Sequence, residues 1–304
     1  MKIERRKQLS AEEFVEAYLA PGRPVIVTDA MLAWSASSRL NPAYVERELG
    51  QFDVLVYDNL FDLQDICLLS RYLKEHFNKP DDECHLYVRA YSQLRSVDFV
   101  WADSLLDRFK EDWRSPYFLP ESEYVVPFYM GGCTFNPACH RAPYRGLFIS
   151  GKGARTRLHR DPFTSSAMLC QFYGQKSFRL WSPEQAPFVI NDTDFVDPIA
   201  PDLERFPNYH QARVTLDDIL SPGEIIFLPG GWFHDVTCIS DSISITWNFV
   251  HRSRLDALID SMRTNSLEKE LEVVQFFLEP HVGKVGINQL VAFFEERKRS
   301  GAWA

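Results

Sequence analysis

Two short segments of the sequence carry residue types that could bind a metal ion together. The first holds His159 and Asp161, which are two residues apart, so both side chains leave the same face of an extended strand. The second holds His234, directly after the segment 228–233, Leu-Pro-Gly-Gly-Trp-Phe. Two imidazoles and one carboxylate on one side of a metal, with the opposite positions open, form the facial triad of non-haem Fe(II) oxygenases. The sequence therefore predicts a metal site made of His159, Asp161 and His234.

The His-x-Asp pair is weak evidence alone, because chance produces one in roughly every second or third chain of this size. Its surroundings strengthen it. Strand-like sequence flanks His159, and residues 223–234 read as a strand, a tight turn and then His234, which would return that imidazole to the side of an earlier strand. Neighbouring Arg160 is expected to point away from the metal by strand alternation. Asp235 is expected either to orient His234 or to be an exposed acid at the start of a strand.

An Fe(II) oxygenase that uses 2-oxoglutarate must also hold the distal carboxylate of that keto acid and leave one metal position for O2. Lys176 suits the carboxylate, because an ammonium group buried beside an anion keeps its charge. The hydroxyl candidates are Thr156, Thr246 and Tyr87, although a Thr or Tyr on a strand is more often only a good strand former. The predicted cofactors are therefore Fe(II), 2-oxoglutarate and O2.

The composition is that of a globular protein. Of the 304 residues, 45% are hydrophobic and 25% are charged, and the formal net charge of -9 argues against strong nucleic acid binding. The basic start, residues 1–7, is not followed by an apolar segment, and no run is long enough to span a membrane. We therefore expect a soluble intracellular protein, cytoplasmic, or nuclear if the source is eukaryotic, with its six scattered cysteines reduced.

Residues 1–122 mix predicted helices with short strands. Helices are expected at 10–20, 41–50 and 63–78, and the first two begin with capping residues. Strands are expected at 24–28 and 54–57.

Residues 123–251 consist of short apolar runs separated by Gly and Pro, which indicates a sandwich or barrel. The segment 184–222 contains no comparable run and is interpreted as a long insertion, a kind of loop that often serves function. In the run 242–249, Trp247 is expected to face the core on the side opposite Thr246. From 252 to 304 three helical stripes predict a C-terminal helical tail, which either caps the barrel or forms a homodimer interface.

Several of these segments together resemble the jumonji-C domain oxygenases. The resemblance rests on His159-x-Asp161, Gly174-x-Lys176, the turn 228–234 and the alternating run 242–249, and it extends to 142–148 and to the opening Phe14, Tyr18 and 24–27. It is closest to the cupin-like hydroxylase branch, which contains the phosphatidylserine-receptor-type lysyl hydroxylase and the hypoxia-factor asparaginyl hydroxylase. The resemblance covers most of residues 10–250.

The resemblance implies a mainly β fold with flanking helices (α+β): a double-stranded β-helix, the jelly-roll or cupin core, behind an N-terminal α/β lead-in. It implies that His159, Asp161 and His234 hold iron and that Lys176, Thr246, Thr156 and Tyr87 hold 2-oxoglutarate. One feature departs from the family, since many relatives place an Asn between the first metal motif and the Lys, and residues 162–175 contain none. Ser165, Ser166 and Gln171 are the candidates to replace it.

Three functions remain open at the level of sequence. The preferred one is an Fe(II)- and 2-oxoglutarate-dependent dioxygenase that hydroxylates an unactivated C–H group of a protein side chain and releases succinate and CO2. The second is the same chemistry on a small molecule or a sugar, such as a lipopolysaccharide sugar. The third is a non-enzymatic cupin-like binding module, which the presence of all three ligands and the Lys disfavours. Demethylation is a less favoured variant of the enzymatic function. The residues that bind the substrate are expected in 90–140 and 184–222.

Overall fold

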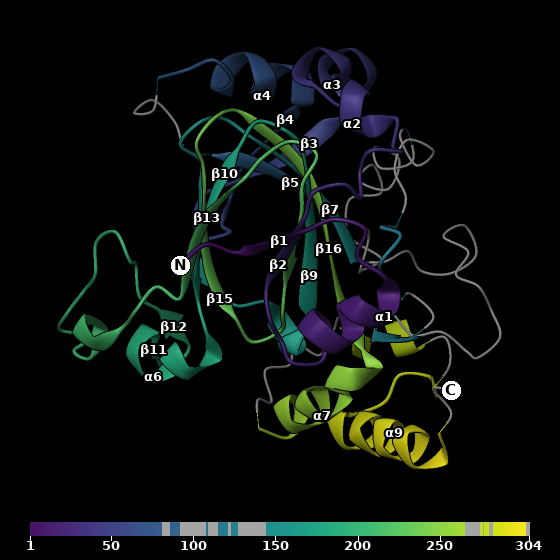
Figure 1. The fold of residues 1–304 in the computed structure, drawn as a ribbon. Coiled ribbons are helices and arrows are strands. Elements are labelled where there is room, and N and C mark those ends of the chain that lie inside the picture. The colour runs from purple at the N-terminus through teal and green to yellow at the C-terminus, as the bar shows by residue number, and fades with distance from the viewer. Residues whose placement is uncertain are drawn as a thin grey trace.

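Two sheets, antiparallel except for the parallel pair β1 and β2, face one another and form the core of the molecule (Figure 1). The computed structural model describes residues 1–80, 86–91, 108, 115–120, 123–126, 144–264, 274–275, 277–279 and 282–301. The described residues confirm the predicted jelly-roll core with flanking helices. Most of the segment 90–140, in which substrate residues were expected, lies outside them.

The larger sheet has ten strands within the described residues. Its order along the sheet is β1 (Glu4–Arg6), β2 (Val25–Val27), β14 (Ile225–Leu228), β9 (Ser166–Tyr173), β16 (Ser242–His251), β7 (Tyr144–Ser150), β5 (Tyr87–Tyr91), β3 (Asp53–Tyr57) and β4 (Leu63–Leu68), with β6 (Tyr124–Val126) also paired to β16. Strands from the predicted N-terminal region thus extend the same sheet as the central strands. The boundaries proposed at 122 and 251 stay a prediction.

The smaller sheet carries most of the chemistry. Its order is β13 (Leu216–Leu220), β10 (Lys176–Trp181), β15 (Phe233–Cys238) and β8 (Arg155–His159). Beside it lies a small subdomain that contains the strand pair β11 (Ile190–Asn191) and β12 (Asp194–Phe195), the helix α6 (Ala186–Val189) and the 3₁₀ turns η4 (Pro183–Gln185) and η5 (Tyr209–Gln211).

Strand β16 shows how the sequence pattern makes an interior with two characters. Its odd-numbered residues from Ile243 to Phe249, including Trp247, are buried in the main hydrophobic core, as the alternation predicts. Its even-numbered residues are polar and buried: Ser242, Ser244, Thr246 and Asn248. The second set faces the smaller sheet, because Ser244 accepts a hydrogen bond from Lys176 of β10. The space between the sheets is therefore polar on this side.

Helices cover both ends of the barrel (Figure 1). The helices α2 (Ala36–Arg39), α3 (Pro42–Leu49) and α4 (Leu69–His76) lie at one end, and α7 (Leu255–Thr264) and α9 (Ile287–Ser300) at the other. The predicted first helix is present as α1 (Ala11–Phe14), continued by the wider turn η1 (Val15–Leu19), and Ser10 caps it by accepting from Glu13 N–H at 3.1 Å. No helix among the described residues is both long and apolar enough to cross a membrane.

The prediction of one helix over 63–78 is wrong in its first half. Residues Leu63–Leu68 form β4, an antiparallel partner of β3, and only Leu69–His76 are helical. The apparent stripe joined apolar residues of two different elements. The buried face of α4 consists of Leu69, Tyr72 and Leu73.

The prediction that 184–222 contains no strand is also wrong, because β13 lies inside it. The strand is hard to recognise since two of its five residues are Asp217 and Asp218. Asp218 is nevertheless buried, and its charge is balanced by Arg5. A strand that buries a paired carboxylate does not show the apolar alternation of an ordinary edge strand.

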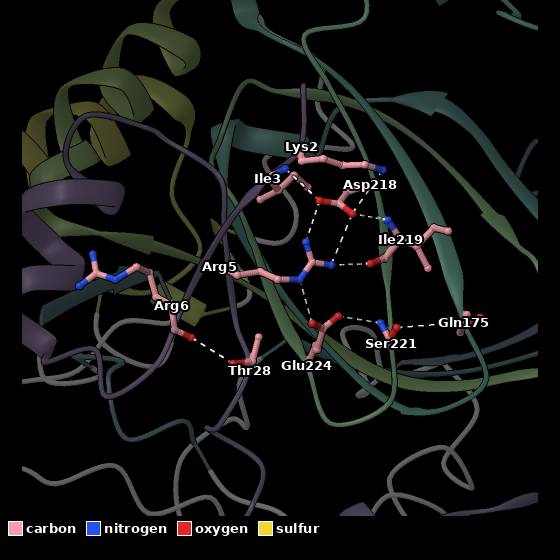
Figure 2. Close-up of polar contacts among 10 residues, drawn as sticks. All are labelled: Lys2, Ile3, Arg5, Arg6, Thr28, Gln175, Asp218, Ile219, Ser221 and Glu224. Carbon is pink, nitrogen blue, oxygen red and sulfur yellow. Dashed lines mark hydrogen bonds and ion pairs between the residues drawn. The ribbon is translucent and has the colours of Figure 1, made fainter.

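The N-terminal strand joins both sheets through this carboxylate (Figure 2). Arg5 donates to the Asp218 carboxylate at 2.8 Å and, through Nε, to Glu224 at 3.0 Å. Ile3 N–H donates to the same Asp218 carboxylate at 3.0 Å. Asp218 belongs to β13 and Glu224 directly precedes β14, so this cluster connects the smaller sheet to the larger one.

The C-terminal helices bury their apolar stripes within the chain. Leu255, Leu258, Ile259 and Met262 of α7 pack with Val125, Val126, Phe163 and Val250 in one hydrophobic cluster. The first stripe therefore caps the barrel end. Of the second predicted stripe, only residues 274–275 and 277–279 are described. A homodimer through these helices stays a prediction.

Candidate metal centre

The three predicted metal ligands converge in the structure. The donor atoms of His159, Asp161 and His234 all lie within 4.8 Å of one another. His159 ends β8 and is the register partner of His234 in the neighbouring antiparallel strand β15, so that their ring centroids are 4.1 Å apart. Asp161 follows the strand with an extended backbone and begins the 3₁₀ turn η3 (Pro162–Thr164). One strand pair thus supplies both imidazoles, and the turn that follows β8 supplies the carboxylate.

The turn before His234 depends on two glycines. A Cβ at Gly230 would lie 1.9 Å from the carbonyl oxygen of Thr164, which is closer than any real contact. Gly231 adopts a positive φ of 88°, a conformation that residues with a side chain rarely reach. The turn can therefore pass directly beside η3, and β15 starts where His234 meets His159.

The hydrogen bonds of the imidazoles leave their Nε2 atoms for a metal. His159 Nδ1 lies 2.8 Å from the carbonyl oxygen of Arg157 and His234 Nδ1 lies 3.4 Å from that of Trp232. A carbonyl only accepts, so the His159 proton sits on Nδ1. Burial holds the pKa of His159 well below its usual value and so favours the neutral ring that a metal requires.

Burial raises the pKa of Asp161, while the nearby His234 and a hydrogen bond from Asn248 act in the opposite direction. The charge of Arg89, on β5, also lowers the pKa of both Asp161 and His159. A divalent cation between the three donors would favour the ionised carboxylate much more strongly. The donor set, with two imidazoles and one carboxylate, suits Fe(II).

Lys176 shares one cavity of about 260 Å³ with the three donors. Its side chain is buried, and burial lowers its pKa. The ammonium donates to Ser244 Oγ at 2.8 Å and lies 5.4 Å from the centroid of the Phe148 ring. Within the part of the chain that the structure describes, no carboxylate pairs with it. A buried ammonium with three donors and one hydrogen bond is suited to receive an anion.

The hydroxyl candidates differ in their surroundings. Thr246 lines the cavity, but its hydroxyl donates to the carbonyl oxygen of Met168 at 2.8 Å and is left only as an acceptor. Thr156 also lines the cavity and lies next to the hydroxyl of Tyr87. That hydroxyl is buried, makes no hydrogen bond of normal geometry with a described residue, and has its pKa raised to about 12 by burial. Tyr87 therefore keeps a donor for a ligand.

Asn248 is a cavity residue that the sequence did not single out. Its amide donates to Ser165 Oγ at 3.2 Å and its side chain also contacts Asp161. Ser166 accepts from Gly230 N–H at 3.2 Å. Gln171 donates to Ser242 Oγ at 2.8 Å. The sequence could have predicted its position, because Asn248 follows Thr246 by two residues on an alternating strand, and both side chains therefore leave the same face.

The residues next to the metal ligands, Arg160 and Asp235, differ in burial: Arg160 is exposed and Asp235 is buried. Arg160, which was expected to point away from the metal, is exposed but is among the residues that line the cavity, because β8 ends at His159 and strand alternation does not extend to it. Asp235, one of whose predicted roles was an exposed acid, is instead 1% exposed on the outer face of β15. It pairs with Arg155 and with Arg179 at 3.0 Å, and Arg155 also binds Asp197 at 2.8 Å. This buried cluster attaches the subdomain around β12 to the strands that carry the histidines.

The fold and the three-donor centre define a jelly-roll protein with a metal site between its sheets, and sequence comparison agrees. The chain belongs to the family of cupin-like domains, whose model matches residues 10–255. It is 27% identical over 271 residues to Arginine-specific demethylase JMJ20 of Arabidopsis thaliana. The match covers 84% of this chain and 58% of that protein.

Two further relatives carry names of oxygenases. The chain is 24% identical over 260 residues to the 2-oxoglutarate and iron-dependent oxygenase JMJD4 of Gallus gallus, covering 82% of this chain and 60% of the relative. It is 22% identical over 256 residues to the human Bifunctional peptidase and (3S)-lysyl hydroxylase JMJD7, and the match covers 77% of this chain and 79% of that protein. The chain spans about three fifths of the plant and chicken relatives.

Proposed function

We propose that this chain is an Fe(II)- and 2-oxoglutarate-dependent dioxygenase that hydroxylates an unactivated C–H group on a protein side chain, with release of succinate and CO2. One observation carries the proposal: the three converging donors and a buried lysine without a partner carboxylate among the described residues line the same cavity. The names of the chicken and human relatives support the same class of reaction.

His159, Asp161 and His234 would hold the iron, which when bound supplies the activation of O2. The protein prepares this binding by keeping His159 neutral and by directing its Nδ1–H to the Arg157 carbonyl. The short strand pairing between β8 and β15 fixes the distance between the two rings. No loop closure is needed to bring the donors together.

Lys176 would hold the distal carboxylate of 2-oxoglutarate through a charge-assisted hydrogen bond. Ser244 fixes the ammonium by accepting a hydrogen bond from it, and the hydroxyl group of Tyr87 is a donor left for the same anion. Thr156, beside Tyr87, would complete this part of the cavity wall. Thr246 contributes an acceptor and part of the wall. The apolar residues Leu169, Phe178 and Leu228 line the remaining wall and keep water from the anion.

The size of the cavity favours a side chain over a free sugar as the second reactant. About 260 Å³ lies below the roughly 300 to 1,000 Å³ of typical sites that enclose a whole small molecule. Hydroxylation of a small molecule or sugar is the alternative, and demethylation, for which the plant relative is named, follows from the same first chemistry.

The decisive experiment measures anaerobic binding of Fe(II) and 2-oxoglutarate, followed by succinate release on admission of air. We expect wild-type protein to release succinate and His159→Ala to release none above the background of free iron. His210→Ala is the matched control, because His210 is exposed on η5 and away from the cavity. Equal succinate release by wild type and His159→Ala would exclude the enzyme and leave a binding module.

A substrate screen separates the two enzymatic alternatives. Wild-type protein with Fe(II), 2-oxoglutarate and air is incubated with a protein extract and, separately, with a pool of glycolipids and metabolites. We expect a mass gain of one oxygen on a peptide. A gain confined to the second pool would contradict the protein substrate.

A further inference from the structure

The outer side of β4 is an edge of the larger sheet. β4 ends the order of described strands, and among them only β3 pairs with it. Leu69 N–H donates to the Phe52 carbonyl at 2.9 Å, so Cys67, two residues earlier, also directs its backbone groups toward β3. The N–H and carbonyl groups of Ile66 and Leu68 therefore point outward. An edge of this kind is a template for a further strand.

The exposed side chains along this edge are apolar. Leu60, Leu63, Ile66 and Leu68 are between 45 and 53% exposed. Strand edges in water are more often protected by charged side chains or proline. The outward N–H of Ile66 donates to the carboxylate of the adjacent Asp65 at 2.8 Å. The carbonyl group of an added strand can take the place of this carboxylate, so the edge is able to accept a partner.

The turn between β3 and β4 connects this edge to the metal cavity. The Asp58 carboxylate holds the turn by accepting from two of its N–H groups, at 2.8 and 3.1 Å. Phe61, in the turn, has a positive φ of 67° and lines the cavity, with its ring centroid 5.1 Å from that of His159. Ile66 lies five residues further along the chain. A segment paired with Ile66 can therefore reach the metal with a residue roughly five positions away, at about 3.3 Å per residue.

The hairpin formed by β3 and β4 is acidic. Residues 53–68 contain four aspartates and no lysine, arginine or histidine. Arg71 of α4 lies 3.5 Å from Asp65, but it also binds Glu75 at 2.9 Å, so the pair of Arg71 and Glu75 adds no net positive charge. An edge that is both apolar and acidic is complementary to a strand that alternates apolar and basic side chains.

The same charge argues against a second copy of this chain as the partner. In an antiparallel pair of two β4 edges related by a twofold axis, the aspartates of one copy would meet those of the other. Like charges opposite one another destabilise a strand pair. The edge is therefore suited to a different, basic chain.

We propose that the outer edge of β4 binds an extended segment of the protein substrate as an added strand, and that this segment alternates lysine or arginine with apolar residues. The proposal rests on the function proposed above, because the edge leads to the same metal cavity. Hydrogen bonds to the backbone of Ile66 and Leu68 hold the segment, and the carboxylates of Asp53, Asp62 and Asp65 select basic side chains.

Hydrogen exchange of the wild-type protein tests the edge directly. The Zn(II)-loaded chain, which does not turn over, is mixed with a peptide of alternating lysine and valine or with one of alternating glutamate and valine, and exchange is followed by mass spectrometry. We expect the lysine peptide to slow exchange in residues 63–68 and the glutamate peptide to leave it unchanged. The strand β13, at the edge of the smaller sheet, is the internal control and should be unaffected by either peptide.

A pair of variants isolates the backbone contribution. Leu68→Pro removes an outward N–H without changing the charge of the edge, and Leu68 already has a φ of -60°, which suits proline. Leu68→Ala is the matched control, because it also removes the leucine side chain but keeps the N–H. Thermal melting establishes that both variants are folded. We expect Leu68→Pro to bind the lysine peptide at least about fivefold more weakly than Leu68→Ala in fluorescence anisotropy, the effect of one lost hydrogen bond.

The substrate itself provides a second readout. Among the peptides that gain one oxygen in the screen of a protein extract, we expect a segment of alternating basic and apolar residues roughly five positions from the modified residue. Modified peptides without such a segment would show that the substrate does not pair with β4.

Three results of the binding experiments overturn the proposal: unchanged exchange in 63–68 with the lysine peptide, equal slowing by the glutamate peptide, or equal binding by the two Leu68 variants. A wild-type dimer in sedimentation that Leu68→Pro disperses would assign the edge to a second copy instead. If Leu68→Pro does not fold, the exchange experiment decides alone. Neither binding experiment needs iron or turnover, so both are interpretable even if wild type releases no succinate, in which case the proposed function fails separately.

Discussion

At the scale of single residues, Lys176 shows a conflict between stability and binding. Burial disfavours its charged form and lowers its pKa, and one hydrogen bond to Ser244 compensates only in part. Such a side chain weakens the folded state until an anion arrives. Its retention in a cavity beside a metal centre is therefore better explained by binding than by packing.

Replacing Lys176 by Met should separate these two effects. We expect Lys176→Met to raise the apparent requirement for 2-oxoglutarate by about 10- to 100-fold, since a hydrogen bond to a charged group contributes roughly 1.5 to 3 kcal/mol. Iron binding should be unchanged. The requirement is measured as the concentration of 2-oxoglutarate at half-maximal succinate release, and an unchanged value would place the distal carboxylate elsewhere.

The same substitution should stabilise the ligand-free protein by about 1 to 2 kcal/mol at pH 7. Burial holds the folded pKa of Lys176 below its usual value of 10.5, so the charged side chain is unfavourable below the folded pKa. This penalty fades as the pH rises from the folded pKa toward 10.5. Urea unfolding at pH 7 and pH 10 should therefore show a smaller gap between variant and wild type at pH 10. A constant gap would mean that packing, not charge, explains it.

At the scale of elements, the strand β15 carries His234 on one face and Asp235 on the other. Asp235 binds Arg155 and Arg179, and Arg155 reaches Asp197 beside β12. The strand that carries the metal ligand His234 therefore also attaches the subdomain, through Asp235 and Arg155. A change in the attachment of the subdomain would act on the backbone of His234.

We expect Asp235→Ala to lower the free energy of unfolding by about 3 kcal/mol, because it leaves Arg155 buried with only Asp197 as a partner. Asp53→Ala is the control, as Asp53 is an exposed strand residue and should change stability by no more than about 0.5 kcal/mol. Urea unfolding measures both. Zn(II) affinity should also fall by roughly tenfold in Asp235→Ala. Equal stability of the two variants would show that the cluster contributes little.

The sequence predicted elements well where one pattern coincided with one element. The alternation of 242–249 predicted the strand β16 and the face of it on which Trp247 is buried. The capping residues Ser10 and Asn41 predicted the starts of α1 and α3. It failed at 63–78, where an apolar stripe crossed from a strand to a helix, and at β13, where a buried Asp replaced an apolar residue. The two failures differ in cause. At β4 the cause is local, because the strand pairs with β3 in a hairpin and a helix follows it directly, whereas the partners of β13, the strand β10 and Arg5, are distant in sequence.

The candidate site follows the same rule. His159, Asp161, His234 and Lys176 were recognisable, because their chemistry limits the residue types. Arg89 and Phe61 were not, because an arginine on a strand and a phenylalanine in a turn have no distinctive spacing. Only the folded structure shows that both residues line the cavity of the metal centre.

At the scale of the whole molecule, the two sheets must stay in register to keep the donors of the smaller sheet opposite the polar face of β16. The cluster of Arg5, Asp218 and Glu224 contributes to this register, because it joins β1 of the larger sheet to β13 of the smaller one (Figure 2). Asp218 also accepts from the N–H groups of Ile3 and Ile219, at 3.0 and 2.8 Å. Lys2 lies 3.6 Å from the same carboxylate, so a single carboxylate serves four partners.

Replacing this carboxylate should destabilise the protein in a pH-dependent way. Burial alone would raise the pKa of Asp218, but the hydrogen bonds from Arg5, Ile219 and Ile3 outweigh it and hold the pKa below its usual value of 3.8. A carboxylate with a depressed folded pKa stabilises the protein above the unfolded pKa, and this stabilisation is lost as the pH falls through the folded pKa. We expect Asp218→Asn to lower the free energy of unfolding by about 2 kcal/mol at pH 7, and the gap to wild type should narrow as the pH falls below 3.8. Denaturant unfolding at pH 7, 5 and 3 measures it, with the exposed neighbour Asp217→Asn as the control that should stay within about 0.5 kcal/mol of wild type. A gap that stayed constant down to pH 3 would show that the Asp218 charge does not hold the two sheets together.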